Sequence, residues 1–244
     1  MTEYLLLLAI YGLASFLQGV VGFGFALLSV PLVATIYDPP TAVAMNAVVG
    51  TANCGYKAWL LRKQSDPRGV LAFTGVAFLL VPAGVAAITL LSKEPALVLM
   101  GSFVLLVAAG NLYNRERMRA VMRRGGSFWS LSVAAGLLAG AFSSPGPVAV
   151  PYFLSRDTNP MVAKANLNLF FILVSVPVIL FHGLAGNLTI DAVTRAVIYL
   201  PVVFVFTYLG TLLSRRASEP RLRLIVDLGL IALGVWLILE NTVF

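Results

Sequence analysis

The chain of 244 residues is 59% hydrophobic and only 11% charged, whereas a soluble domain carries about 25% charged residues. This composition excludes a water-soluble globular protein and indicates an integral membrane protein in a lipid bilayer. A net charge of +7 would suggest nucleic-acid binding in a soluble protein. In a membrane protein basic loops report orientation instead, so we expect no nucleic-acid partner.

Charged and turn-forming residues divide the sequence into eight apolar segments. In chain order they span residues 4–36, 41–61, 69–91, 95–113, 128–155, 161–183, 190–213 and 221–240. Most are close to the roughly 20 residues with which a helix crosses a bilayer. Lipid offers the backbone no hydrogen-bond partners, so the segments must be helical. The sequence therefore predicts an all-α integral membrane protein.

The first and fifth segments are too long for one crossing. Thirty-four uncharged residues separate Glu3 from Asp38, and 31 separate Arg124 from Arg156. A straight helix of such length would measure about 45–50 Å, well beyond the hydrocarbon core. Each has glycine or proline in its middle, at residues 19–24 and 143–147. We expect both helices to break there.

The two halves resemble copies of each other. A shift of about 120 residues superposes punctuating residues in the same order: Pro31 on Pro151, Pro40 on Pro160, Asn46 on Asn166 and Pro82 on Pro201. Each half also has a long broken segment followed by three ordinary ones. We therefore predict an N-terminal repeat, residues 1–124, and a C-terminal repeat, residues 125–244, that together form one transmembrane domain.

The positive charges select a topology. Suppose that each long segment enters the membrane, breaks and returns to its starting side. The 15 Lys and Arg residues outside the helix interiors then divide 13 to two between the faces, against nine to six if each long segment crosses once. The positive-inside rule favours the first arrangement, with both termini outside. Each repeat then makes three crossings, so the repeats are inverted, as in secondary transporters. The alternative is a pair of tilted, kinked helices that cross once.

The two breaks predict an anion site. A short helix begins after each break, and its N-terminus presents unpaired N–H groups and a partial positive charge. Gly22, Gly24 and Gly146 would let the backbone approach an oxyanion closely. Ser143 or Ser144 would act as N-cap and bind the anion. The alternative is that these small residues only permit tight helix packing.

A few polar residues lie inside the predicted spans. We expect Asn46 and Asn166 to occupy equivalent, inward-facing places and, with Lys164, to contribute to the site. Alternatively the two asparagines clamp neighbouring helices, and Lys164 extends to the headgroups. Asp227 could carry a coupling proton or pair with a basic neighbour. His182 fits a structural role better than a proton relay.

The sequence resembles the sulfite exporter TauE/SafE family over nearly the whole chain, and three stretches carry the resemblance. GVVGFGFALLSVP at residues 19–31 is similar to the family's opening motif, G-x-x-G-x-G-G-G followed by Val-Pro, with Phe25 and Ala26 where further glycines are usual. GLLAG at residues 136–140 with Gly146-Pro147 resembles its Gly-Pro variant. Pro201, Gly210 and Gly234 match the last two helices.

The resemblance implies a transporter that exports sulfite, a sulfonate such as sulfoacetate, or another small anion across the bacterial inner membrane. No G-x-x-x-x-G-K-[ST] loop is present, so we expect a proton or sodium gradient, or the membrane potential, to drive it. We expect no cofactor and no enzyme activity. Small carboxylates, an intramembrane enzyme and an assembly factor are the alternatives. A homodimer is left open.

The charge pattern makes a direct prediction of orientation. Cysteines introduced at Gly126 and at Glu219 should be shielded from a membrane-impermeant thiol reagent in intact cells, because the basic loops beside them face the cytoplasm. Both should react once the cells are permeabilised. Labelling of either from outside would contradict the inverted arrangement.

Overall fold

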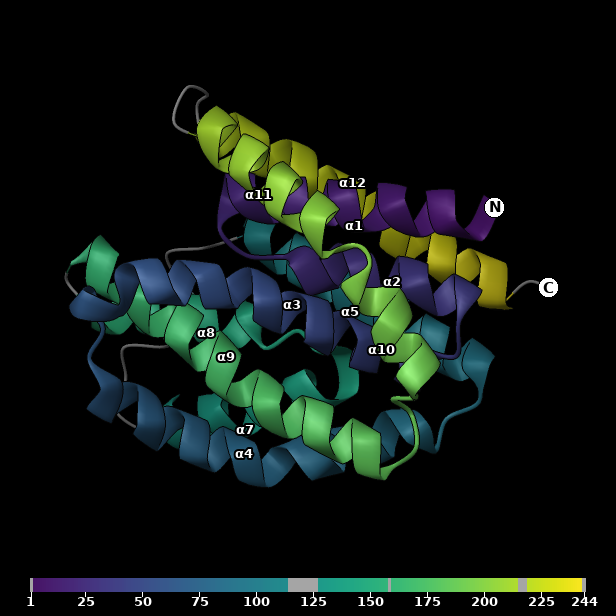
Figure 1. Cartoon of the computed structure of the whole chain (residues 1–244), viewed down its shortest axis with the longest axis horizontal. Helices are drawn as coiled ribbons and strands as arrows, with labels where there is room; N and C mark the ends of the chain where they lie inside the picture. Colours follow the sequence, from purple (N-terminus) through teal and green to yellow (C-terminus); the bar gives the residue numbers. More distant parts are fainter. Residues whose placement is uncertain (1, 114–126, 158, 215–218, 243–244) are drawn as a thin grey trace.

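The chain folds into helices throughout its described part. The structure is a computed structural model that describes residues 2–113, 127–157, 159–214 and 219–242. The secondary structure of these residues is entirely helical, as predicted (Figure 1). The predicted loop at 115–124 and the start of the one at 215–223 lie outside the described residues.

The helices follow the predicted segments closely, and both long segments break where expected. The N-terminal half contains α1 (Thr2–Val21), α2 (Phe25–Ile36), α3 (Pro39–Leu61), the 3-10 turn η1 (Arg62–Gln64), α4 (Pro67–Thr89) and α5 (Lys93–Tyr113). The C-terminal half contains α7 (Ser127–Phe142), α8 (Gly146–Arg156), α9 (Pro160–Leu184), α10 (Ile190–Val197), α11 (Leu200–Ser214) and α12 (Glu219–Thr242). One break was not predicted: segment 190–213 bends by 41° between α10 and α11.

Local sequence explains where several helices begin. Proline stands in the first turn of α3, α4, α8 and α9, where its missing N–H costs no hydrogen bond. The Asn159 side chain accepts a hydrogen bond from the Met161 N–H and caps α9. The Thr189 hydroxyl accepts one from the Ala192 N–H and caps α10.

Polar contacts gather at one end of the molecule, here called the Tyr37 end. Tyr37 donates to the carboxylate of Glu3, and Arg195 forms a salt bridge of 3.1 Å with the same carboxylate. Lys93 donates to the carbonyl of Thr35 at 3.2 Å. Burial and the hydrogen bond to Glu3 raise the pKa of Tyr37 to about 12, so the phenol stays protonated as a donor. Both chain termini lie at this end (Figure 1).

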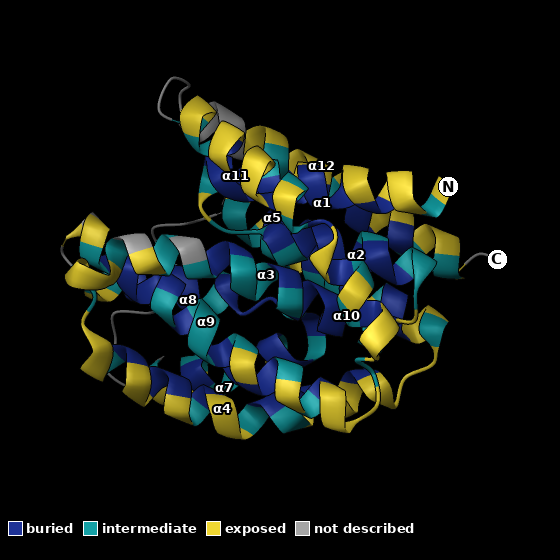
Figure 2. Cartoon of the chain, viewed as in Figure 1, coloured by how far each residue is buried: buried dark blue, intermediate teal, exposed yellow. Residues whose placement is uncertain are grey.

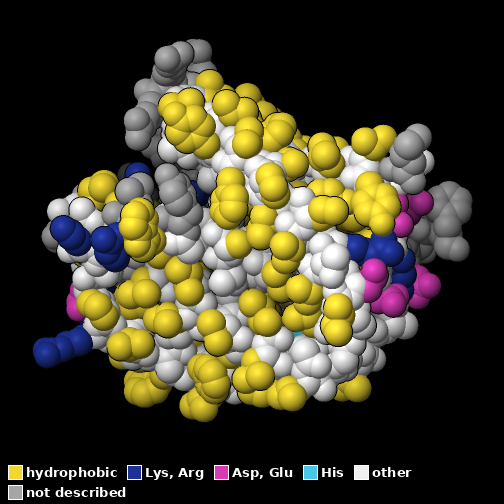
Figure 3. All heavy atoms as spheres, viewed as in Figure 1, with side chains coloured by type: hydrophobic (Ala, Val, Ile, Leu, Met, Phe, Trp, Pro, Cys, Tyr) yellow, Lys and Arg dark blue, Asp and Glu magenta, His cyan; other side chains and the backbone are white. Residues whose placement is uncertain are grey.

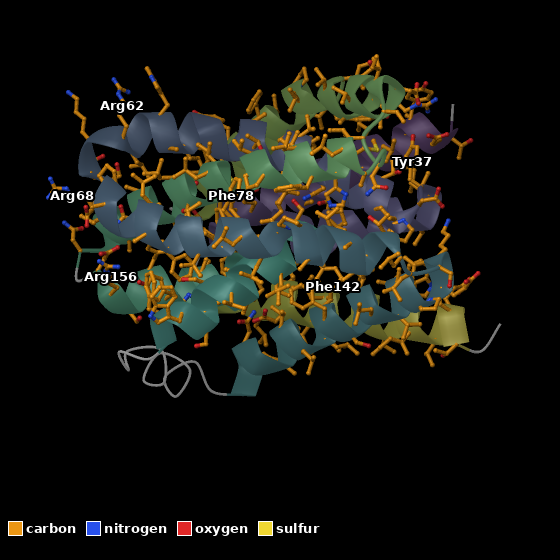
Figure 4. All side chains as sticks on the ribbon, turned by 90° about the horizontal axis from the view of Figure 1, so that it is seen from below. Tyr37, Arg62, Arg68, Phe78, Phe142 and Arg156 are labelled. Carbon is orange, nitrogen blue, oxygen red and sulfur yellow. The ribbon has the colours of Figure 1, made fainter. Side chains whose placement is uncertain are left out.

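The opposite end, here called the Arg156 end, carries basic residues. Arg62, Arg68 and Arg156 lie there, across the length of the helices from Tyr37 (Figure 4). The turns after α3 and α8 meet at this end, because Asn166 accepts from the Asp66 N–H at 2.7 Å and donates to Asp157 at 2.9 Å. The full-length helices α3, α4, α5 and α9 run between the two ends.

Each broken segment forms a hairpin that returns to its starting end. The N-hairpin, residues 2–36, starts and ends at the Tyr37 end, where Glu3 contacts Tyr37. The C-hairpin, residues 127–156, starts and ends toward the Arg156 end, where the rings of Phe128 and Tyr152 lie 6.3 Å apart. The hairpins thus point at each other from opposite ends. This packing is compatible with two inverted repeats, which stay a prediction.

Close glycine contacts join each hairpin to a helix of the other half. Helix α1 packs on α11, and α7 packs on α4. A β-carbon on Gly210 would lie 2.1 Å from the Phe16 carbonyl oxygen, and one on Gly140 would lie 2.2 Å from that of Val81. Small residues let the backbones approach so closely. Two apolar cores result, one around each hairpin.

The outer surface is apolar between the two charged ends. Large side chains such as Leu79 and Leu106 are 71% and 73% exposed, and buried residues concentrate in the centre (Figure 2). Hydrophobic side chains cover the middle of the visible face, with charged groups at both ends (Figure 3). Among the described residues five helices are long and apolar enough to cross a membrane, or six if α10 and α11 form one span. The chain is a multi-pass membrane protein.

The α4–α7 contact can be tested with two glycines of one helix. A β-carbon on Gly84 would lie 2.3 Å from the Leu137 carbonyl oxygen, whereas one on Gly75 would meet no atom within 4 Å. Gly84→Ala should lower the free energy of unfolding by about 1–3 kcal/mol through overpacking. Gly75→Ala should leave it unchanged or raise it by about 0.5–1 kcal/mol. Thermal denaturation in detergent measures both; equal midpoints would contradict the close packing.

Candidate functional site

A cavity of about 60 Å³ lies where the tips of the two hairpins meet. Five parts of the chain line it: α1, the N-hairpin tip, α3, the C-hairpin tip and α9. The lining residues are Gln18, Phe23, Gly24, Phe25, Ala26, Asn46, Gly50, Cys54, Ser143, Ser144, Pro145, Gly146, Phe171 and Ser175. One buried water needs about 10–15 Å³ on this measure, so the cavity suits a small oxyanion or the head group of a larger one.

Most of the predicted site residues meet in this cavity. Gly24, Asn46, Ser143, Ser144 and Gly146 all line it, although they come from three separate stretches of sequence. A β-carbon on Gly146 would lie 3.8 Å from both the Phe23 and Phe171 rings, which places the C-hairpin tip against the N-hairpin tip and α9.

The N-hairpin tip requires glycine for its backbone conformation. Gly22 has φ of 90° and Gly24 has φ of 98°, a region that side chains disfavour. A β-carbon on either would meet no atom within 4 Å, so space is not the constraint. Gly22 shapes the turn without lining the cavity. Helix α2 begins directly after the turn, so Phe25 and Ala26, whose N–H groups have no partner within their own helix, lie at the cavity.

The serines of the C-hairpin tip do not cap α8, so this part of the sequence prediction is wrong. The N-cap position is Pro145, and no side chain caps the helix. Proline at 145 and 147 removes two of the N–H groups that a serine cap would bind. Among the described residues the hydroxyls of Ser143 and Ser144 have no hydrogen-bond partner, and Ser144 is only 5% exposed. Both hydroxyls are free to bind a ligand.

Asn46 presents its side-chain amide to the same cavity. The hydroxyl of Ser29, one turn into α2, contacts both the Phe25 carbonyl and the Asn46 amide. The Asn46 side chain is 1% exposed and thus ties α3 to the N-hairpin.

Asn166 and Lys164 lie away from the cavity. Asn166 is buried, as expected, but its partners are Asp66 and Asp157 at the Arg156 end. Asn166 therefore does not line the cavity with Asn46, so its predicted contribution to the site is wrong, and the equivalence of the two places stays a prediction. Lys164 is exposed.

A chain of buried amides beside the cavity was not assigned to the site from sequence. Asn53 donates to Gln18 Oε1 at 2.8 Å and accepts from the Thr207 hydroxyl at 3.0 Å. Gln18 Nε2 lies 3.7 Å from the Cys54 sulfur. The chain links α1, α3 and α11 and orients Gln18 and Cys54 in the cavity wall. The seven-residue spacing of Asn46 and Asn53 indicates their shared helix face.

His182 supports the C-hairpin tip from behind. Its Nε2 lies 2.9 Å from the Gly140 carbonyl, and its Nδ1 lies 3.1 Å from Asn187 Nδ2. Gly140 is in the last turn of α7, where carbonyls lack helical partners. With Nε2 protonated, His182 satisfies that carbonyl and accepts from Asn187. Asp227 lies elsewhere, between α5 and α12, and accepts from Asn111 at 2.9 Å.

Comparison with known proteins identifies relatives along nearly the whole chain. The family model described as Sulfite exporter TauE/SafE matches residues 7–237. The probable sulfite/organosulfonate exporter TauE of Cupriavidus necator is 27% identical over 235 residues, which cover 95% of this chain and 92% of that protein. No solved structure matches the chain.

The amide chain makes a testable contribution to the cavity wall. Asn53→Ala would leave the buried Gln18 Oε1 without its donor and remove the bond from the Thr207 hydroxyl, so the free energy of unfolding should fall by about 1–3 kcal/mol. Thr51→Ala on the same helix removes only a bond to the Ala47 carbonyl and should change it by less than about 1 kcal/mol. Denaturation of the two purified variants compares them. Equal losses would mean that the amide chain adds nothing.

Proposed function

This chain belongs to the sulfite exporter TauE/SafE family, and from that membership we propose that it is a secondary transporter of a small anion. The proposed cargo is sulfite or an organosulfonate such as sulfoacetate, exported across the bacterial inner membrane. The single observation that carries the site is the cavity between the two hairpin tips. There Ser143, Ser144, the Gly146 backbone and the Gly24 turn bind the anion through hydrogen bonds rather than through a cationic side chain.

Helix N-termini explain why such a site attracts an anion. Helices α2 and α8 both begin at the cavity, and each N-terminus carries a partial positive charge of about one half. The contribution is about 0.3–1 kcal/mol at an exposed terminus and up to about 2 kcal/mol when partly buried. Attraction of this size holds a substrate loosely enough for release, as a carrier requires.

Alternating access requires each end of the cavity to open in turn. On the Tyr37 end, Arg195 of α10 fastens the C-terminal half to the N-hairpin through Glu3 and Tyr37. On the Arg156 end, Asn166 joins the turn after α8 to the turn after α3. We assign these polar contacts as the closures that separate when the hairpins rock against the other helices.

The proposed orientation follows from charge. The Arg156 end faces the cytoplasm and both termini lie outside, by the positive-inside rule. Transport draws on the membrane potential or on a coupled proton or sodium ion, and the chain works either alone or as a homodimer. None of these features depends on the identity of the anion.

Purified protein in liposomes tests the function. Sulfite, sulfoacetate, taurine and acetate are each loaded inside, and their release is measured against protein-free liposomes. Release of the sulfur anions supports the proposal, and preferential release of acetate would favour a transporter of small carboxylates. No release of any of them would leave an intramembrane enzyme or an assembly factor as the better reading.

The site itself is tested by a negative charge. Ser144→Asp places a carboxylate in the cavity and should abolish transport, because like charges repel in a poorly solvated site. Ser155→Asp in α8, the helix that follows Ser144, serves as the control, since the Ser155 hydroxyl donates to the Tyr152 carbonyl and lies beside Arg156. It should transport at near the wild-type rate. A well-folded Ser144→Asp protein with wild-type transport would contradict this site.

A further inference from the structure

We propose that the cavity selects singly charged sulfur oxyanions, namely hydrogen sulfite and small alkanesulfonates, over dianions such as sulfate, sulfoacetate and doubly ionised sulfite. This proposal rests on the transport function proposed above and narrows its substrate class, because it makes sulfoacetate a poorer cargo than hydrogen sulfite or a small alkanesulfonate. It is carried by the charge of the cavity wall, by the donors left free there, and by a second small cavity beside Ser144.

The wall of the cavity holds no formal positive charge. None of the described residues that line it is Lys, Arg, His, Asp or Glu. Cys54 is its one titratable lining group, and Lys57, one turn further along α3, is the charged residue whose field reaches that thiol. Lys57 itself does not line the cavity. An anion bound here therefore meets dipoles, with no ion pair.

The free donors are sufficient for one oxyanion group. The hydroxyls of Ser143 and Ser144 have no partner among the described residues, and the Asn46 amide lines the same cavity. The Gly146 N–H and the first N–H groups of α2 add backbone donors. These groups come from three separate stretches of the chain that line the cavity, which suits the three oxygens of a sulfonate or hydrogen sulfite.

The partial charges of the site match one negative charge. Two helix N-termini supply about one half of a positive charge each, hence about one in total. A monoanion is neutralised by this sum, whereas a dianion retains a net buried charge. The penalty for burying an ion grows with the square of its charge, so it falls most heavily on the dianion.

A second cavity shows what can lie next to the bound group. This cavity, of about 10 Å³, shares Ala26 and Ser144 with the first, and its other lining residues are apolar, including Val30, Met100 and Phe142. It has room for about one methyl-sized group. The carbon of methanesulfonate fits such a space, whereas the carboxylate of sulfoacetate would enter it without any donor.

Transport from liposomes at two pH values tests the proposal. The sulfite dianion takes up its first proton, which forms hydrogen sulfite, close to neutral pH, whereas methanesulfonate is a monoanion throughout. The ratio of the sulfite rate to the methanesulfonate rate should fall about tenfold between about pH 6 and about pH 8, following the hydrogen sulfite fraction. Dividing the sulfite rate by the methanesulfonate rate removes the pH dependence of the protein itself, including that of Cys54 and Lys57. A constant or rising ratio would overturn the inference and leave the transport function standing.

A positive charge added to the cavity wall provides the second test. Ser175→Lys places a cation in the wall and should raise sulfoacetate transport relative to methanesulfonate at least several-fold, whereas Ser175→Met should not. The same preference can be measured without transport. Methanesulfonate, sulfate and sulfoacetate are each added to the detergent-solubilised protein, and the shift of its melting temperature is compared. Wild-type stabilisation by sulfate or sulfoacetate as large as that by methanesulfonate would overturn the proposal. If wild-type liposomes release neither sulfite nor methanesulfonate, the transport function fails and the inference with it.

Discussion

The structure depends on how the backbone groups at two helix breaks are satisfied inside an apolar protein. A break leaves carbonyls unpaired on the helix that ends and N–H groups unpaired on the helix that begins. The protein supplies partners for the carbonyl side: His182 reaches Gly140, and Thr211 makes a long contact of 3.5 Å with Gly19. The Gly146 N–H at the start of α8 and the first residues of α2 lie at the cavity instead, where we propose that an anion binds.

The same arrangement explains the exchanged packing of the two halves. A hairpin that stops short of the far end cannot bury its long arm against its own half alone. The α1–α11 and α4–α7 contacts solve this problem, because glycine pairs bring the backbones together at both places. Each hairpin thus packs its first arm on the opposite half and its second arm on its own half, through the α2–α3 and α8–α9 contacts, and a small shift between the halves would move both tips. This coupling is what a carrier with one central site requires.

Sequence alone predicted the helices, both breaks and the family. It also predicted that Gly24 and Ser144 lie at one site. Glycine, proline and charge act on the local backbone, so their positions are visible in the sequence. The sequence did not predict which side chains form hydrogen bonds with residues far away along the chain. Asn166 bonds to the backbone of Asp66, 100 residues away, and no pattern near either residue indicates that bond. Ser175 and Cys54 reach the cavity only through helix packing. The two prolines around Gly146 prevented the serine cap, although a serine before a helix ordinarily favours one.

The central claim is that an anion binds between the two hairpin tips, and Cys54 reports on that place directly, since it is the single cysteine of the chain and lines the cavity. The measurement is the rate at which a small uncharged thiol reagent labels Cys54 in the purified protein, with and without methanesulfonate. Methanesulfonate is chosen because, unlike sulfite, it does not react with the reagent. The account predicts slower labelling as methanesulfonate fills the cavity, with chloride at the same ionic strength as control. An unchanged rate at concentrations that saturate transport would contradict the account.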